Sequence, residues 1–310
     1  MNEPALVLVA FVIRGDSSQA EGHRRARAGY NVNRLGQGVE DAGTAERQLV
    51  MTGSPQLEWE AFDEYWRKVH GPKIVHREGP ADAATPALGF YLQQHRLPAG
   101  PSSEAPAPYL PPLDADGLLD GTPAAHCRAY QRPLFDGLAQ LGFDSRQALD
   151  TFFDMQGKYG LKIVPDEQVF IRGFAYNLSE EYPVIAGDRR SAPVLLVRLH
   201  QRATILDRPA FRGHWMTHHA DLVRRHPDAQ ALVRRYVQLV NVVEAGDPLH
   251  DELGQQFDGV GVYSFANMND CEDFVASAAH AAIVEDEARF TGQTSYFTAL
   301  NYVICDRLPA

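Results

Sequence analysis

Cysteine is scarce in this chain of 310 residues: Cys127, Cys271 and Cys305 lie far apart, and no CxxC pair occurs. An odd number of widely spaced cysteines argues against a disulfide framework and against a zinc knuckle. Free thiols are kept reduced inside the cell, so this usage predicts a cytoplasmic protein.

Long apolar runs are also missing near the start of the chain. The opening run ALVLVAFVI (residues 5–13) is short, and Glu3 precedes it where a signal peptide would carry basic residues. Because a membrane-spanning helix needs about 20 apolar residues, this run is too short to cross a bilayer. It predicts a buried β-strand and no membrane partner.

Basic charge is in short supply, since the net charge is −11. A negative overall field opposes binding to phosphate backbones. The basic run GHRRARAGYNVNR (residues 22–34) is interpreted as a solvated loop. The motifs GxSxG, P-loop and HExxH are absent. We therefore expect no nucleic-acid partner, and an ordinary globular protein with 45% hydrophobic residues.

What the chain does contain is a repeat. Phe62, Trp66 and His70 recur every fourth residue, which places them on one stripe of a helix. The same stripe returns at identical spacing later in the chain, as Phe211, Trp215 and His219.

Further blocks repeat in the same order. YLQQHRL at Tyr91 matches YVQLVNV at Tyr236, and FDGLAQLGF (135–143) matches FDGVGVYSF (257–265). IVPDEQVF (163–170) matches IVEDEARF (283–290). The short apolar blocks predict strands and the blocks between them predict helices. Each half then reads strand, helix, strand, strand, helix, strand, which is the α+β ferredoxin-like (βαββαβ) unit.

The two copies differ in length. We expect a first unit over residues 1–177, a linker over 178–192 and a compact second unit over 193–310. The first unit carries two inserts, at about 15–56 and 97–125, and the second insert is rich in proline. Loops of this length inside a compact unit are usually lids, binding loops or disordered segments.

Together these blocks resemble the EthD-like branch of the dimeric α/β-barrel proteins. The resemblance is carried by Trp-x-x-x-His followed by Gly/Ala-x-x-Ile/Val, by Tyr-x-Gln, by the Phe-Asp-Gly strand and by Asp-Glu-x-x-Phe. It implies that two fused copies form a pseudo-dimeric α/β barrel within one chain, with further homodimerisation left open. It also implies a cavity within each unit, between sheet and helices.

The resemblance further implies activities that need no cofactor, on aromatic or polyketide-like molecules. Some more distant barrel relatives bind haem, so haem on a pocket histidine is the alternative to no cofactor. Because a barrel of this kind hosts unrelated activities, the fold alone does not fix the reaction.

Three residues are candidates for catalysis. His70 can give and take protons near neutral pH, and Tyr91 or Tyr65 would orient an enol or phenol oxygen. The alternative for His70 is a helix cap, because Gly71-Pro72 predicts the end of its helix.

Candidate substrate-binding residues lie on the helix stripes and on the Tyr-x-Gln strands. They are Phe62, Trp66, His95, Gln93, His219, Trp215 and Tyr236. Tyr91, Gln93 and His95 share one strand face, which either meets the cavity or is half exposed. For the two tryptophans the alternative is a purely structural role.

Weaker signals complete the set. His214 and His218 have the spacing of two metal ligands, but without a visible carboxylate partner they are interpreted as an exposed helix face, and no metal is expected. The pairs Asp166-Glu167 and Asp286-Glu287 are interpreted as exposed caps between helix and strand.

The sequence thus favours a cofactor-independent enzyme that acts on a hydrophobic aromatic or polyketide-like molecule by proton transfer, through cyclisation, dehydration or decarboxylation. A cofactor-free monooxygenase on a phenolic substrate and a non-catalytic small-molecule-binding or accessory protein are the alternatives.

Overall fold

The computed structural model describes residues 5–14, 59–97, 100–103, 115–116, 118 and 135–308. The insert at 15–56 lies outside these residues, and so does most of the insert at 97–125. The expectation that these inserts are lids, binding loops or disordered segments therefore stays a prediction. Within the described part of the chain, no helix is long and apolar enough to cross a bilayer.

Eight antiparallel strands close into a barrel in the order β1-β3-β2-β8-β5-β7-β6-β4. The strands are β1 (Leu6–Arg14), β2 (Phe90–Arg96), β3 (Gly137–Phe143), β4 (Ile171–Ile185), β5 (Val194–Arg202), β6 (Arg235–Asn241), β7 (Gly259–Phe265) and β8 (Thr291–Asp306). Each half contributes four neighbouring strands, and the seams β2–β8 and β4–β6 join the halves. The predicted pseudo-dimeric barrel of two ferredoxin-like units is confirmed.

The last strand of each half is long enough to belong to both sheets. β4 pairs with β1 and then continues along β6, where Ser179 lies opposite Asn241. β8 does the same with β5 and β2. Residues 178–185, expected to be linker, are therefore part of β4. Interstrand pairing with β6 keeps this segment extended and closes one seam of the barrel.

Both faces of β1 are buried, which explains its continuous apolar sequence. Val7, Val9 and Phe11 face a core built from both halves, which is the barrel interior. Leu8 and Ala10 face the opposite way and pack with the helices of the first half. Alternating residues thus serve two cores, and no polar side chain is needed on either face.

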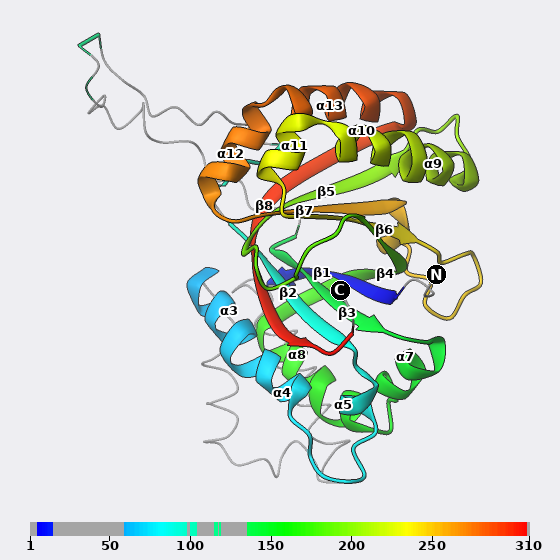
Figure 1. Ribbon diagram of the computed structural model, residues 1–310. Coiled ribbons are helices and arrows are strands. Elements are labelled where there is room, and N and C mark those ends of the chain that lie inside the picture. Colours follow the sequence, from blue (N-terminus) through cyan, green and yellow to red (C-terminus); the bar gives the residue numbers. More distant parts are fainter. Residues whose placement is uncertain are drawn as a thin grey trace.

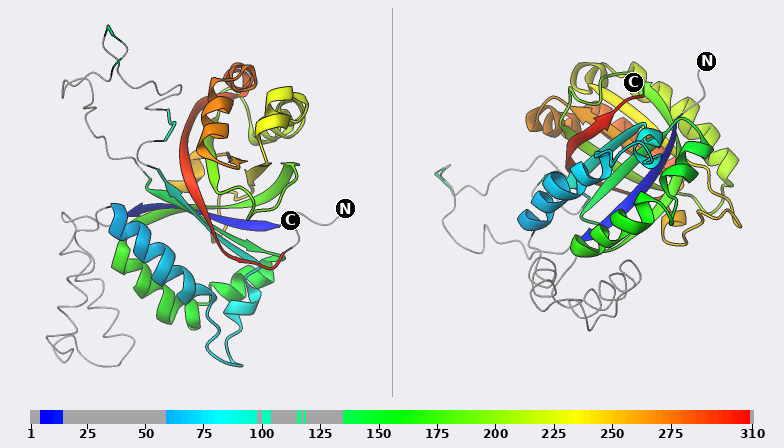
Figure 2. Two further views of the ribbon diagram at one scale, coloured as in Figure 1. Left: turned by 60° about the vertical axis from the view of Figure 1, so that its left-hand side comes forward. Right: turned by 90° about the horizontal axis from the view of Figure 1, so that it is seen from below.

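Two long helical segments cover the outside of each half-sheet, so the helices form layers on opposite sides of the barrel (Figures 1 and 2). In the first half they are α3 (Trp59–Tyr65), η3 (Trp66–His70) and α4 (Gly71–Val75) as one continuous segment, and η4 (Tyr159–Ile163) with α8 (Val164–Phe170) as the other. In the second half they are α9 (Arg208–His214), η5 (Trp215–His219) and α10 (Ala220–Arg225), and α13 (Ala278–Phe290). The shorter helices are α5 (Ala84–Ala87), α7 (Arg146–Phe152), α11 (Pro227–Leu232), η6 (Gly254–Gln256) and α12 (Met268–Ala276).

A π-helical turn carries the Trp-x-x-x-His motif in each half. The amide of Gly71 donates to the carbonyl of Trp66, and the amide of Ala220 donates to that of Trp215, five residues back in both cases. The predicted helix end at Gly71-Pro72 is wrong, because the helix runs on to Val75. The π-helical turn closes at the amide of Gly71, directly before Pro72, which has no amide hydrogen to donate. A proline is best tolerated where the hydrogen-bond pattern of the helix already changes.

The tryptophan of each motif packs over the glycine of a Phe-Asp-Gly block. A Cβ on Gly137 would lie 2.8 Å from Cζ3 of Trp66, and a Cβ on Gly259 would lie 2.1 Å from Cζ3 of Trp215. Both indoles are almost completely buried. Glycine at this strand start therefore makes room for the helix to approach the sheet.

Candidate active site

A cavity lies between the sheet and the helices of the first half, as the resemblance implied. It has an inner chamber of about 40 Å³ and an adjoining outer chamber of about 370 Å³. Six residues line both chambers: Leu8, Phe153, Tyr159, Glu167, Ile171 and Phe174. The inner chamber ends at Trp66, His70 and Tyr91. The outer chamber reaches Met155, which is exposed, and Leu249 from the β6–β7 loop of the other half.

Glu167 brings a carboxyl group to the wall that both chambers share. It comes from α8, and the hydroxyl of Tyr159 donates to its carboxyl oxygens at 3.3 and 3.4 Å. Burial raises the pKa of Glu167 to about 8; the Tyr159 hydroxyl opposes this shift, and the negative charge of Asp166 adds to it. At neutral pH the carboxyl therefore holds a proton inside a mostly apolar cavity.

Tyr91 marks the inner end of the cavity. Its hydroxyl accepts hydrogen bonds from Nε1 of Trp66 at 3.1 Å and from Nε2 of Gln93 at 3.0 Å. Burial raises the pKa of Tyr91 far above its usual value, so the phenol stays neutral. Because both contacts are donors to the oxygen, the proton of Tyr91 is available to a third partner.

His70 is held by a carboxylate, and within the described part of the chain it makes no hydrogen bond to a helix carbonyl. Asp166 from α8 accepts from Nδ1 of His70 at 2.8 Å and from the hydroxyl of Tyr65 at 2.9 Å, and it also pairs with Nζ of Lys73. Burial alone would raise the pKa of Asp166, but the bonds to His70 and Lys73 lower it below its usual value. The ionised carboxylate therefore accepts a hydrogen bond from Nδ1–H of His70, and this bond holds the ring toward α8.

Phe62 and His95 pack against Trp66, on the side of the indole away from the cavity. Phe62 packs against Trp66 with ring centroids 5.3 Å apart. His95 stacks on the same indole at 4.2 Å, and its Nδ1 contacts Oδ1 of Asp63 at 2.6 Å. Burial lowers the pKa of His95, against the opposing effect of Asp63. Phe62, Gln93 and His95 line neither chamber, whereas Trp66, His70 and Tyr91 line the inner one.

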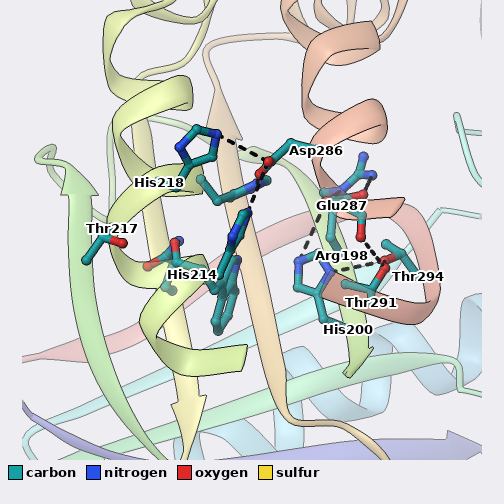
Figure 3. A network of polar contacts seen from close by, with 12 residues as sticks. Arg198, His200, His214, Thr217, His218, Asp286, Glu287, Thr291 and Thr294 are labelled. Carbon is teal, nitrogen blue, oxygen red and sulfur yellow. Dashed lines mark hydrogen bonds and ion pairs between the residues drawn. The ribbon is translucent and has the colours of Figure 1, made fainter. Parts of the chain in front are cut away.

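In the second half, larger side chains fill the corresponding space. Strand register places Arg198 where the first half has Ala10, and His200 where it has Val12. Nε of Arg198 donates to Oε1 of Glu287 at 2.7 Å, beneath α13 (Figure 3). Tyr263, opposite Tyr236 as Leu141 is opposite Tyr91, stacks on Tyr236 at 4.0 Å.

The second-half candidates therefore lie in packed surroundings. Trp215 contacts His200 edge-on with centroids 5.1 Å apart. Nδ1 of His219 donates to Oδ2 of Asp286 at 2.9 Å, as His70 does to Asp166. The structure packs Trp215 against His200, His219 against Asp286 and Tyr236 against Tyr263. None of the three candidates lines the first-half cavity.

Glu167 and Tyr159 were missed by sequence reasoning. The interpretation of the two acidic pairs as exposed caps is wrong, because Asp166, Asp286 and Glu287 are buried. A usable signal was present in Asp-Glu-x-x-Phe: Asp166 lies four residues and Glu167 three residues before the buried Phe170, and both spacings place a carboxylate on the helix face of the aromatic. That face packs on the sheet in both halves.

A haem on His70 does not fit this arrangement. The chamber that His70 lines has room for a few water molecules at most, and Nδ1 is engaged by Asp166. With the side chains as they stand, the porphyrin plane has no space beside this ring.

The fold and the cavity define a single-chain α/β barrel of two unequal ferredoxin-like units. The EthD domain model matches residues 54–173 and 204–294, and the chain belongs to the EthD family. The match covers one segment in each half, which agrees with the tandem arrangement of the barrel.

Three solved structures illustrate the wider resemblance. An anthrone oxidase-like protein is 9% identical (99% of this chain and 97% of that chain, TM-score 0.49). A candidate monooxygenase from Lactobacillus acidophilus is 10% identical (98% and 97%, TM-score 0.45). Chlorite dismutase from Candidatus Nitrospira defluvii is 10% identical (98% and 93%, TM-score 0.43). No curated protein matches the chain. Identities this low carry no information about activity.

Proposed function

We propose that this protein is a cofactor-independent enzyme that binds a hydrophobic, aromatic or polyketide-like small molecule in the first-half cavity and transfers protons to and from it. The observation that carries the proposal is Glu167, a carboxyl group that is protonated at neutral pH and lines both chambers. A pKa near the working pH is what a general acid or base needs.

The size and lining of the cavity support this substrate class. About 370 Å³ is within the range of small-molecule sites, and Phe153, Phe174 and Tyr176 offer flat apolar surface. A ring system in the outer chamber would place its inner edge at Glu167, with Tyr91 farther in. Tyr91 would then donate a hydrogen bond to a carbonyl or enol oxygen.

Dehydration illustrates a balanced cycle. Glu167 donates its proton to the leaving hydroxyl, so the carbon–oxygen bond breaks and water departs. The carboxylate so formed takes the proton from the neighbouring carbon, whose electron pair forms the new double bond. Glu167 ends protonated, as it began. Cyclisation and decarboxylation use the same acid and base steps on an enolisable carbonyl.

The binding step can be tested with 1-naphthol as a neutral aromatic probe, using calorimetry on the full chain. Val164→Trp would fill the outer chamber and should weaken binding about tenfold or more, because the occupied volume is lost. Val284→Trp is the matched control, since Val284 is the equivalent residue on the exposed face of α13. Equal affinities in both variants would mean that the probe binds elsewhere.

The chemical step is tested with enolisable polyketones, followed by mass spectrometry. Glu167→Gln should lower turnover by roughly 100-fold or more, the usual scale for losing a positioned acid or base. Loss of water or carbon dioxide, or ring closure without a change in mass, supports the proposal. A product heavier by one oxygen atom supports the monooxygenase alternative and overturns the proton-transfer reaction.

A further inference from the structure

Three potential metal ligands meet on the outer face of the second half. His214 ends α9, His218 lies in the π-turn η5, and Asp286 comes from α13. Nε2 of His214 is 3.0 Å from Oδ1 of Asp286, and Nε2 of His218 is 3.5 Å from the same oxygen. All three ligand atoms lie within 4.8 Å of one another. Figure 3 shows both imidazoles beside the carboxylate, above the buried Arg198–Glu287 pair.

The spacing of these atoms is close to that of a coordination sphere. A tetrahedral zinc ion with bonds of roughly 2.0–2.1 Å has ligand atoms about 3.3 Å apart. Two of the three separations are already near this value. Small rotations of the two imidazoles would admit the ion, which would replace their direct contacts with Asp286.

The π-turn and a hydrogen bond from His219 fix the orientation of the Asp286 carboxylate for metal binding. On an α-helix, residues five apart point in clearly different directions. The π-turn brings His219 to the same carboxylate as His214, and Nδ1 of His219 donates to Oδ2 of Asp286 at 2.9 Å. This bond orients Oδ1 toward the two other histidines, as outer contacts do for metal-binding carboxylates.

The site is also reachable from solvent. The side chain of His218 is 60% exposed and that of His214 is 29% exposed, whereas Asp286 is buried. An ion can therefore enter past His218 and keep water on its outer side. Such an open position is what distinguishes a three-ligand site from a closed structural one.

The first half shows the same carboxylate without a metal site. Tyr65 takes the place of His214, and Val69 takes the place of His218. Lys73, where the second half has Leu222, supplies a cation to Asp166 directly. In the second half Leu222 replaces this lysine, and the Nε2 atoms of His214 and His218 face the carboxylate of Asp286 instead.

We propose that His214, His218 and Asp286 bind a divalent transition-metal ion of the zinc type, with water completing the coordination. Imidazole and carboxylate are ligands that suit Zn²⁺, Ni²⁺ and Cu²⁺. The site lies outside the first-half cavity, so the proposal does not depend on the function proposed for Glu167.

The test uses the full chain without an affinity tag, freed of metal by chelation and titrated with Zn²⁺ by competition calorimetry. His214→Tyr and His218→Val introduce the first-half residues, which the same helical turn already accommodates there. Each should weaken binding of the single high-affinity Zn²⁺ by about tenfold or more. His250→Ala is the control for surface histidines, since His250 is exposed in the β6–β7 loop.

Two outcomes decide the proposal. One Zn²⁺ per chain that binds about tenfold or more weakly to both variants, and with wild-type affinity to His250→Ala, supports it. Equal Zn²⁺ affinity in the wild type and in both variants, with melting temperatures unchanged, overturns it. Zn²⁺ should also raise the melting temperature of the wild type, because a ligand that binds only the folded state stabilises that state. The melting temperature of His218→Val should not change on addition of Zn²⁺.

Discussion

Nε of Arg198 donates to Oε1 of Glu287 at 2.7 Å, whereas the first-half equivalent of Arg198 is Ala10, and among the residues that the structure describes no cation pairs with Glu167. Burial alone would raise the pKa of Glu287, but Arg198 lowers it below its usual value. Burial raises the pKa of Glu167 to about 8. One carboxyl position thus holds a charged, paired group in one half and a neutral acid in the other.

Arg198→Met is expected to destabilise the protein by about 3–5 kcal/mol, because Glu287 would stay buried without its cation. Adding Glu287→Gln to the same chain should restore a large part of this loss, since no charge is then left unpaired. Urea unfolding of the two single variants and the double variant measures the effect. If the losses of unfolding free energy in the two single variants simply add in the double variant, Arg198 and Glu287 are not energetically coupled. That result would contradict the charged, paired state inferred for Glu287.

Glu167→Gln is expected to change how stability depends on pH. The pKa of Glu167 is raised from 4.5 to about 8, so in this interval the folded chain holds a proton that the unfolded chain releases. The stabilisation of wild type relative to Glu167→Gln should therefore be complete below pH 4.5 and lost as pH rises to about 8. Unfolding free energies of both proteins from pH 4 to 9 provide the measurement. A difference in unfolding free energy that does not change with pH would mean that Glu167 is exposed to water and has no raised pKa.

His70→Ala and His219→Ala form a matched pair. Each removes an imidazole bonded to a buried aspartate, so both should lower the melting temperature to a similar extent. Only His70 lines the cavity, and only its loss should lower turnover, by roughly 100-fold. Calorimetry and turnover per folded molecule separate the two effects. A large loss of stability with turnover intact would make His70 a structural residue.

Gly137→Ala is expected to cost about 1–3 kcal/mol, because the added methyl group meets the indole of Trp66 and the carbonyl of Gln94. Gly213→Ala in α9 is the control, since apart from its chain neighbours and the nearby backbone of its own helix no atom of the described residues lies within 4 Å of the added methyl group. It should stabilise the helix by up to about 1 kcal/mol. Thermal unfolding measures both, and equal effects would contradict the packing role of Gly137.

The repeat was enough to predict two ferredoxin-like units, because each apolar block of one half has a counterpart in the other. That the two units close into one barrel was implied by the resemblance to the EthD-like proteins. The π-turns were not predictable in this way. Gly71-Pro72 favours a helix end locally, and tertiary packing on the sheet overrides it. The cavity depends on small residues at Ala10 and Val12, and their significance appears only beside Arg198 and His200 in the folded second half.

The continuous chain through both halves of the barrel has one further consequence. In a barrel made of two identical subunits, every substitution occurs twice, and closing one cavity closes both. Here Arg198 occupies one half while Ala10 keeps the other hollow. Covalent fusion thus allows the two halves to differ. One half can be tightly packed and stabilise the barrel, and the other can retain a cavity although the cavity lowers stability.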